Sequence, residues 1–107
     1  MRTFPRSLAT FRELVNQRGD RLRSLTFAEL EDLARVPSSE SINVESRAAT
    51  ISTIIQHRED GSLRVVLQGF MKLRWLPFGK HVAVDGFYKH PGGAVTPMPD
   101  REFYEFS

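Results

Sequence analysis

The fold is decided by residues 62–75, which read SLRVVLQGFMKLRW. Apolar residues alternate along much of this stretch, as in a β-strand whose side chains point to its two faces in turn. The odd-numbered face carries the apolar side chains of Leu63, Val65, Leu67, Met71 and Leu73. The even-numbered face is mixed, because Val66 and Phe70 stand among basic and amide side chains. We therefore predict a long central strand whose odd-numbered face lies in the core.

Length and composition are those of one folded domain. We predict a single domain over residues 1–107, with a helical part at 1–37 and a sheet part at 42–107. The hydrophobic share of 40% argues against a disordered chain. The absence of cysteine excludes disulfides, thiolate nucleophiles and cysteine metal sites. We find no signal peptide and no membrane-spanning run, so we expect a cytoplasmic protein without membrane contact.

Apolar residues near the N-terminus follow the spacing of one helical face. The stripe consists of Leu8, Phe11, Leu14 and Val15. Polar and charged residues occupy the opposite side, as in a helix that packs on a core. We predict an amphipathic helix over Ser7–Arg18 and expect Gly19 to end it.

A second helix begins with a capping box at residues 26–29, which read TFAE. In this motif the Thr26 hydroxyl accepts a hydrogen bond from the Glu29 amide, and the Glu29 carboxylate accepts one from the Thr26 amide. We expect the helix to end before Pro37, because a proline ring disfavours helical geometry in the preceding residue. Its buried stripe is predicted to be Phe27, Leu30 and Leu33.

Alternating apolar residues predict two strand segments before the central strand. Ile42 and Val44 place the inward face on even positions, whereas Ile51 and Ile55 place it on odd positions. A strand does not change parity without an extra residue or a reversal. We therefore predict a bulge, a bend or a tight turn within Ser46–Ala49.

Two hairpin turns are predicted from glycine-containing stretches. Asp60-Gly61 separates two alternating apolar runs, and both residue types tolerate the positive φ of tight turns. We expect Thr50–His57 to pair antiparallel with the central strand across this turn. Pro91-Gly92-Gly93 predicts a second turn that returns the chain through Ala94–Thr96.

The strand after the central one is predicted to start at Lys80, with Val82 and Val84 on its core face. Asp85-Gly86 allows two interpretations, a two-residue hairpin or a bulge in a strand that continues. We favour the bulge, because the later proline-glycine turn is the stronger hairpin signal. The C-terminal segment Asp100–Phe106 reads as one or two helical turns or as an edge strand.

The order of these elements predicts an α+β fold. Two N-terminal helices pack on one face of a four- to five-stranded antiparallel meander sheet. Both helices are short, so their stability is expected to come from packing on the sheet rather than from helix propensity.

Catalytic and metal sites have little support in the sequence. His57, His81 and His90 do not stand at recognised metal-ligand spacings, and no nucleophile or phosphate-loop motif occurs. We predict no metal, no cofactor and no catalytic residue. Asp85 carries two open interpretations: a cross-strand ion pair with Lys72, Arg74 or His81 if Gly86 bulges or, together with His81, the centre of a small hydrolytic enzyme.

The candidate binding surface is the even-numbered side of the sheet, called here the sheet face. Its residues are Arg64, Gln68, Phe70, Lys72, Arg74, Trp75, Phe87 and Lys89. Trp75 stands in the odd register at the end of the central strand, and Phe87 and Lys89 are added from the next strand according to how Gly86 shifts the register. Aromatic side chains bordered by arginine are typical of protein interfaces. The leading prediction is therefore a protein-protein interaction module, with another protein or a second copy in a homodimer as its partner.

Two alternatives to protein binding stay open for the sheet face. Aromatic side chains that stack on bases, next to cations that neutralise phosphates, would bind single-stranded nucleic acid. In a purely structural interpretation, the face is solvated or is a second core under the C-terminal segment. The net charge is only +2, and basic and acidic residues gather in separate segments, which favours a dipolar surface over a polyanion binder.

Overall fold

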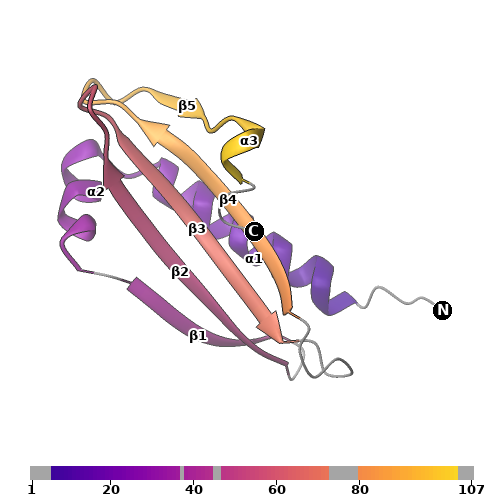
Figure 1. The fold of residues 1–107 in the computed structure, drawn as a ribbon. Helices are drawn as coiled ribbons and strands as arrows, with labels where there is room; N and C mark the ends of the chain where they lie inside the picture. Colours follow the sequence, from indigo (N-terminus) through magenta and orange to yellow (C-terminus); the bar gives the residue numbers. More distant parts are fainter. Residues whose placement is uncertain (1–5, 37, 45–46, 73–79, 104–107) are drawn as a thin grey trace.

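The structure, a computed structural model, describes residues 6–36, 38–44, 47–72 and 80–103 (Figure 1). The helices are α1 (Arg6–Arg23), α2 (Phe27–Ala34) and α3 (Asp100–Phe103). The strands are β1 (Ser38–Val44), β2 (Arg47–His57), β3 (Leu63–Lys72), β4 (Lys80–Lys89) and β5 (Val95–Pro97). No helix within these ranges is both long and apolar enough to cross a lipid bilayer.

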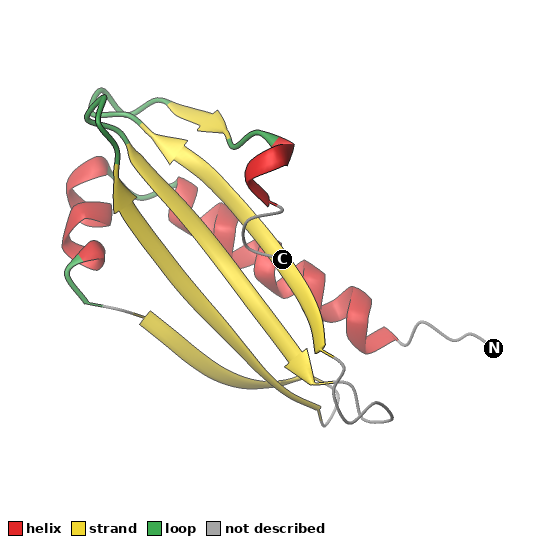
Figure 2. Cartoon of the chain, viewed as in Figure 1, coloured by secondary structure: helices red, strands yellow, loops and turns green. Residues whose placement is uncertain are grey.

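The strands of the described residues form one antiparallel sheet in the order β1-β2-β3-β4-β5. Each strand pairs with the next along the chain, so the sheet is a meander with β3 at its centre. Both N-terminal helices lie on the same face, and Figure 2 shows α1 running behind the sheet. The predicted α+β architecture is confirmed.

The odd-numbered face of β3 is the floor of the core, as predicted. Leu63 is fully buried and belongs to the cluster around Leu30 of α2. Leu67 and Met71 are buried in a second cluster, which contains Phe11 of α1. Burial of one such side chain contributes about 1.5 to 3 kcal/mol to folding. The predicted strand also included residues 73–75, which lie outside the described residues.

Both predicted hairpins are confirmed. Gly61 has a φ of +90°, a conformation that L side chains rarely adopt, in the turn between β2 and β3. Gly93 has a φ of +99° in the turn between β4 and β5, where the His90 amide donates a hydrogen bond to the Ala94 carbonyl at 2.9 Å. β2 therefore pairs antiparallel with β3, and the chain returns through β5.

A chain reversal accounts for the change of inward parity before β3. β1 and β2 pair antiparallel up to Val44 opposite Arg47, so Ile42 and Ile51 both face the helices. The reversal lies between Val44 and Arg47, at the edge of the predicted segment Ser46–Ala49. Residues 45–46 themselves lie outside the described residues.

The capping box of α2 is confirmed, but its buried stripe is shorter than predicted. Thr26 Oγ1 accepts the Glu29 amide at 3.1 Å, and Glu29 Oε1 accepts the Thr26 amide at 2.9 Å. The hydrogen bond that the Thr26 amide donates to the Glu29 carboxylate lowers the pKa of Glu29. Leu30 is fully buried, whereas Leu33 is 44% exposed. The placement of Leu33 in the core was wrong, because the short helix points this side chain past the sheet into a pocket described below.

Gly19 does not end the first helix, which continues to Arg23. Instead, Gly19 is buried where α1 packs on β4. A Cβ atom at this position would collide with the Asp85 carboxylate and would lie 2.9 Å from Arg23 Nη1. Glycine in a helix interior costs about 0.5 to 1 kcal/mol relative to alanine. The contact between α1 and β4 explains why a glycine is placed there.

The bulge or turn predicted at Asp85-Gly86 is also absent. β4 pairs with β3 without interruption from Lys80 to Lys89, and Gly86 stands directly opposite Val66. A Cβ on Gly86 would lie 2.9 Å from Met98 Cε. The glycine therefore makes room for the chain that follows β5, and no change of register is needed.

The unbroken register of β4 reverses the predicted orientation of four side chains. Val82 and Val84 stand opposite Phe70 and Gln68 on the even-numbered face, not on the core face that α1 covers. Phe87 and Lys89 stand opposite Val65 and Leu63 and therefore face the helices. Both predictions failed for the same reason, because the pairing places even-numbered residues of β4 opposite even-numbered residues of β3, so the even positions of the two strands share one face.

The C-terminal part covers one end of the even-numbered face. Val66, Tyr88 and Met98 form a separate buried cluster on this side of the sheet. The helical alternative for the C-terminal segment is confirmed at Asp100–Phe103, and residues 104–107 lie outside the described residues. This end of the face is therefore a second, smaller core.

Two glycine substitutions test how tightly α1 packs on β3. A Cβ on Gly69 would lie 2.6 Å from Phe11 Cζ and 2.9 Å from Val15 Cγ2, both in buried side chains. Gly69→Ala should therefore lower the free energy of unfolding by about 1 to 3 kcal/mol in urea denaturation. Gly92→Ala is the matched control, because nothing lies within 4 Å of its Cβ position and its stability should stay within about 1 kcal/mol of wild type. Equal stability of the two variants would contradict the packing.

Candidate functional site

The predicted sheet face is only partly assembled by the structure. Arg74 and Trp75 lie outside the described residues. The backbone of Lys72 stands opposite Lys80 at the end of β3. Gln68 and Phe70 are half-buried on β3, opposite Val84 and Val82. The described part of this face is therefore not an open array of exposed aromatic side chains.

Arg64 is the predicted binding residue with the clearest set of partners. Its Nη1 donates to Glu102 Oε1 of α3 at 3.0 Å, and its Nε donates to Gln56 Oε1 of β2 at 3.0 Å. The Tyr88 hydroxyl donates a further hydrogen bond to Glu102. Arg58 stacks on the Tyr88 ring, with its guanidinium carbon 4.1 Å from the ring centre. This network attaches α3 to the sheet. It also engages the Arg64 guanidinium, which the nucleic-acid interpretation would pair with a phosphate.

Phe87 and Lys89 belong to the helix side and were wrongly placed on the sheet face. Phe87 is fully buried beside Leu30, and the Arg23 guanidinium carbon lies 4.9 Å from the centre of its ring. Lys89 is only 6% exposed, and its Nζ donates to the Arg23 carbonyl at 3.4 Å. The lysine thereby contacts a carbonyl at the C-terminal end of α1, where the helix dipole favours a cation.

Asp85 forms an ion pair with a helix rather than with a neighbouring strand. Arg23 of α1 donates two hydrogen bonds to it, from Nη1 to Oδ2 and from Nη2 to Oδ1, each 2.8 Å long. The hydrogen bond to Asp85 raises the pKa of Arg23. His81 lies four residues earlier on β4, so its Cα is about 13 Å from that of Asp85 at the rise of a β-strand. The Asp85 carboxylate is paired with Arg23, and the described residues contain no group of three metal-ligating side chains.

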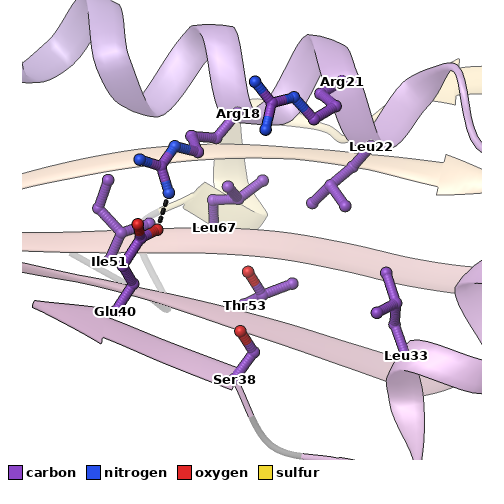
Figure 3. Close-up of a pocket in the computed structure, with 9 residues that line it drawn as sticks. All are labelled: Arg18, Arg21, Leu22, Leu33, Ser38, Glu40, Ile51, Thr53 and Leu67. Carbon is purple, nitrogen blue, oxygen red and sulfur yellow. Dashed lines mark ion pairs between the residues drawn. The ribbon is translucent and has the colours of Figure 1, made fainter.

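A pocket of 220 Å³ lies on the helix side, between α1, α2 and the β1 edge of the sheet. Its lining combines apolar, hydroxyl and charged side chains from three strands and two helices. The residues are Arg18, Arg21, Leu22, Leu33, Ser38, Glu40, Ile51, Thr53 and Leu67. Figure 3 shows Arg18 and Arg21 on α1, across the pocket from Ser38 and Glu40 on β1. The pocket lies beside the start of β1, where Ser38–Ser41 stay exposed.

The charges of the pocket are unequal. Arg18 forms an ion pair with Glu40, which links α1 to β1. Arg21 is exposed and has no ion pair among the described residues. Two cations and one anion leave one net positive charge at the rim, above a floor of leucine and isoleucine.

The β1 strand is the second feature of this region. It forms an edge of the sheet, because among the described residues it pairs only with β2. Ser38, Ser39, Glu40 and Ser41 are all exposed. An edge strand presents unpaired backbone N–H and C=O groups that can pair with another strand. The other edge, β5, has only three residues and ends in Pro97.

Sequence reasoning missed both the pocket and the edge. A usable signal existed, since Leu22 continues the apolar stripe of Phe11 and Val15 when the helix is extended through Gly19. Extension would have placed Arg18 and Arg21 near that stripe. No pattern in the sequence indicated that Leu33 and Glu40 would meet them, because that contact depends on where α2 and β1 lie on the sheet.

Comparisons with protein-family models, curated proteins and solved structures find no match.

The Glu102 network predicts a pH-dependent contribution to stability. The hydrogen bond from Tyr88, together with Arg64, holds the pKa of Glu102 below its ordinary value of 4.5. Because this pKa is lower in the folded state than in the unfolded state, the charged Glu102 carboxylate stabilises the fold at pH values above 4.5. This stabilisation is lost as the pH falls through the pKa of the folded state. Glu102→Gln should therefore cost about 1 to 3 kcal/mol at pH 7 and clearly less in strong acid, measured by urea denaturation.

The exposed Glu13→Gln substitution on α1 is the control for the loss of one negative charge. The change that Glu13→Gln causes in the free energy of unfolding at each pH is subtracted from the change caused by Glu102→Gln. The corrected values at neutral and acidic pH are then compared. A cost of Glu102→Gln that stays the same at neutral and acidic pH would contradict the proposed role of the charged carboxylate.

Proposed function

We propose that this protein acts by binding another polypeptide, which adds a strand to the exposed edge of β1. The single observation that carries this proposal is the seven-residue edge of β1, which pairs only with β2 among the described residues. Strand addition derives its affinity from main-chain hydrogen bonds along such an edge. A protein partner was also the leading expectation from the sequence, but the proposed surface moves from the sheet face to β1.

The two edges of the sheet differ in the way they are protected. Natural edge strands are commonly shortened, interrupted by proline or given charged side chains that oppose pairing. β5 is short and ends in proline. β1 contains no proline or lysine, and its one charge, on Glu40, is neutralised by Arg18. β1 is therefore the edge better suited to pair with another strand.

A second copy of the chain is the partner to test first. An antiparallel pair of β1 strands centred on Ser41 places Glu40 opposite Ile42 and Ser39 opposite Asn43. Like charges that stand directly opposite each other destabilise a strand pair, and this register contains no such pair. A single strand pair buries less surface than a standard interface of about 800 Å² per partner, so we expect weak association.

Ser41→Lys tests this pairing, because it brings two cations together at the centre of the strand pair. Wild-type protein should show concentration-dependent association by light scattering between micromolar and millimolar concentrations, and Ser41→Lys should remain monomeric. Thr10→Lys is the matched control, since it adds the same charge at an exposed position on α1. Its association should equal that of wild type.

Backbone amide exchange locates the contact. In the associated state, amides of β1 should exchange more slowly than in dilute protein. A wild-type chain that stays monomeric at all concentrations would contradict the proposal, as would equal association of the two lysine variants.

A further inference from the structure

We propose that the pocket between α1, α2 and β1 binds a small monoanion with an apolar body, such as a short-chain or aromatic monocarboxylate. This inference is independent of strand addition at β1, because it rests on the side chains of the pocket rather than on the edge of the backbone. The volume of the pocket, its apolar floor and the charge of its rim each restrict the class of ligand.

The size and the floor of the pocket define the body of the ligand. Its volume of 220 Å³ lies below the range of about 300 to 1,000 Å³ that is typical of drug-sized ligands. A molecule the size of hexanoate or benzoate is therefore the appropriate class. Leu22, Ile51 and Leu67 supply an apolar floor. Leu33 is 44% exposed at the pocket and would be covered by an apolar ligand body.

The charges of the rim define the head group. Arg18 is already paired with Glu40, whereas Arg21 has no ion pair among the described residues. A guanidinium group binds a carboxylate through two parallel hydrogen bonds. One net positive charge matches one negative charge, and Glu40 would repel a second one. The rim is therefore better suited to a monocarboxylate than to a phosphate dianion.

Hydroxyl groups complete the polar side of the pocket. Ser38 of β1 and half-buried Thr53 of β2 both line it, on the sheet beneath the arginine side chains (Figure 3). Each hydroxyl is able to donate a hydrogen bond to a carboxylate oxygen. The pocket thus combines an apolar floor with polar groups on two sides, arginine on α1 and hydroxyls on the sheet, as small-molecule sites combine apolar walls with a few polar groups.

The test is a titration of the whole chain with hexanoate, followed by two-dimensional NMR of the backbone amides. Saturable shifts should centre on Ser38 and Thr53. The neutral analogue 1-hexanol should bind at least about tenfold more weakly, because it lacks the charge that Arg21 pairs with. Inorganic phosphate should not compete with hexanoate.

Two arginine variants separate the proposed contact from a general effect of charge. Arg21→Gln should weaken hexanoate binding by about tenfold or more. Arg12→Gln removes an exposed arginine of the same helix outside the pocket and should leave binding unchanged. Both side chains are exposed, so melting temperatures close to that of wild type will show that the fold is intact.

Three results would overturn the inference. They are the absence of saturable shifts at the pocket, equal binding of hexanoate and 1-hexanol, and equal effects of the two arginine substitutions. Ser41→Lys separates this site from the proposed function, because it should block association through β1 and leave hexanoate binding intact.

Discussion

The close contact of α1 with the sheet is the constraint on which the rest of the structure depends. Gly69 leaves room on β3 for Phe11 and Val15, and Gly19 leaves room on α1 for the Asp85 carboxylate. Arg23 then closes the contact with two hydrogen bonds to Asp85. One missing side chain on each element thus sets how near the helix lies to the sheet, and an ion pair that is only partly exposed fixes its C-terminal end.

The position of α1 determines what remains uncovered. The helix lies mainly over β3 and β4, and α2 contacts β2, whereas Ser38–Ser41 at the start of β1 stay exposed. The pocket lies beside this exposed part of β1, whereas the exposed edge follows from the strand order, in which β1 is the first strand of the sheet among the described residues. The Arg18–Glu40 ion pair spans the resulting gap and neutralises the charge of the edge strand. On the opposite face, Arg64 and Tyr88 are engaged by Glu102, which makes that end of the face part of a core.

Features that depend on neighbouring residues could be predicted from the sequence. The alternation of β3, the capping box at Thr26 and the positive φ of Gly61 all follow from local chemistry. Features that depend on packing could not be predicted. Gly19 reads as a helix stop, and Asp85-Gly86 reads as a bulge, until the contact between α1 and β4 is known. Leu33 and Glu40 reach one pocket only because the helices cover part of the sheet, and local periodicity does not specify that cover.

The most direct test of this account is a double-mutant cycle between Gly19 and Asp85, with free energies of unfolding measured in urea. We expect Gly19→Ala to destabilise wild type by about 1 to 3 kcal/mol, because its new methyl group meets the Asp85 carboxylate. In the Asp85→Ala background the same substitution should be neutral, or stabilising by up to about 1 kcal/mol through helix propensity. An equal cost of Gly19→Ala in both backgrounds would contradict the close contact between α1 and β4.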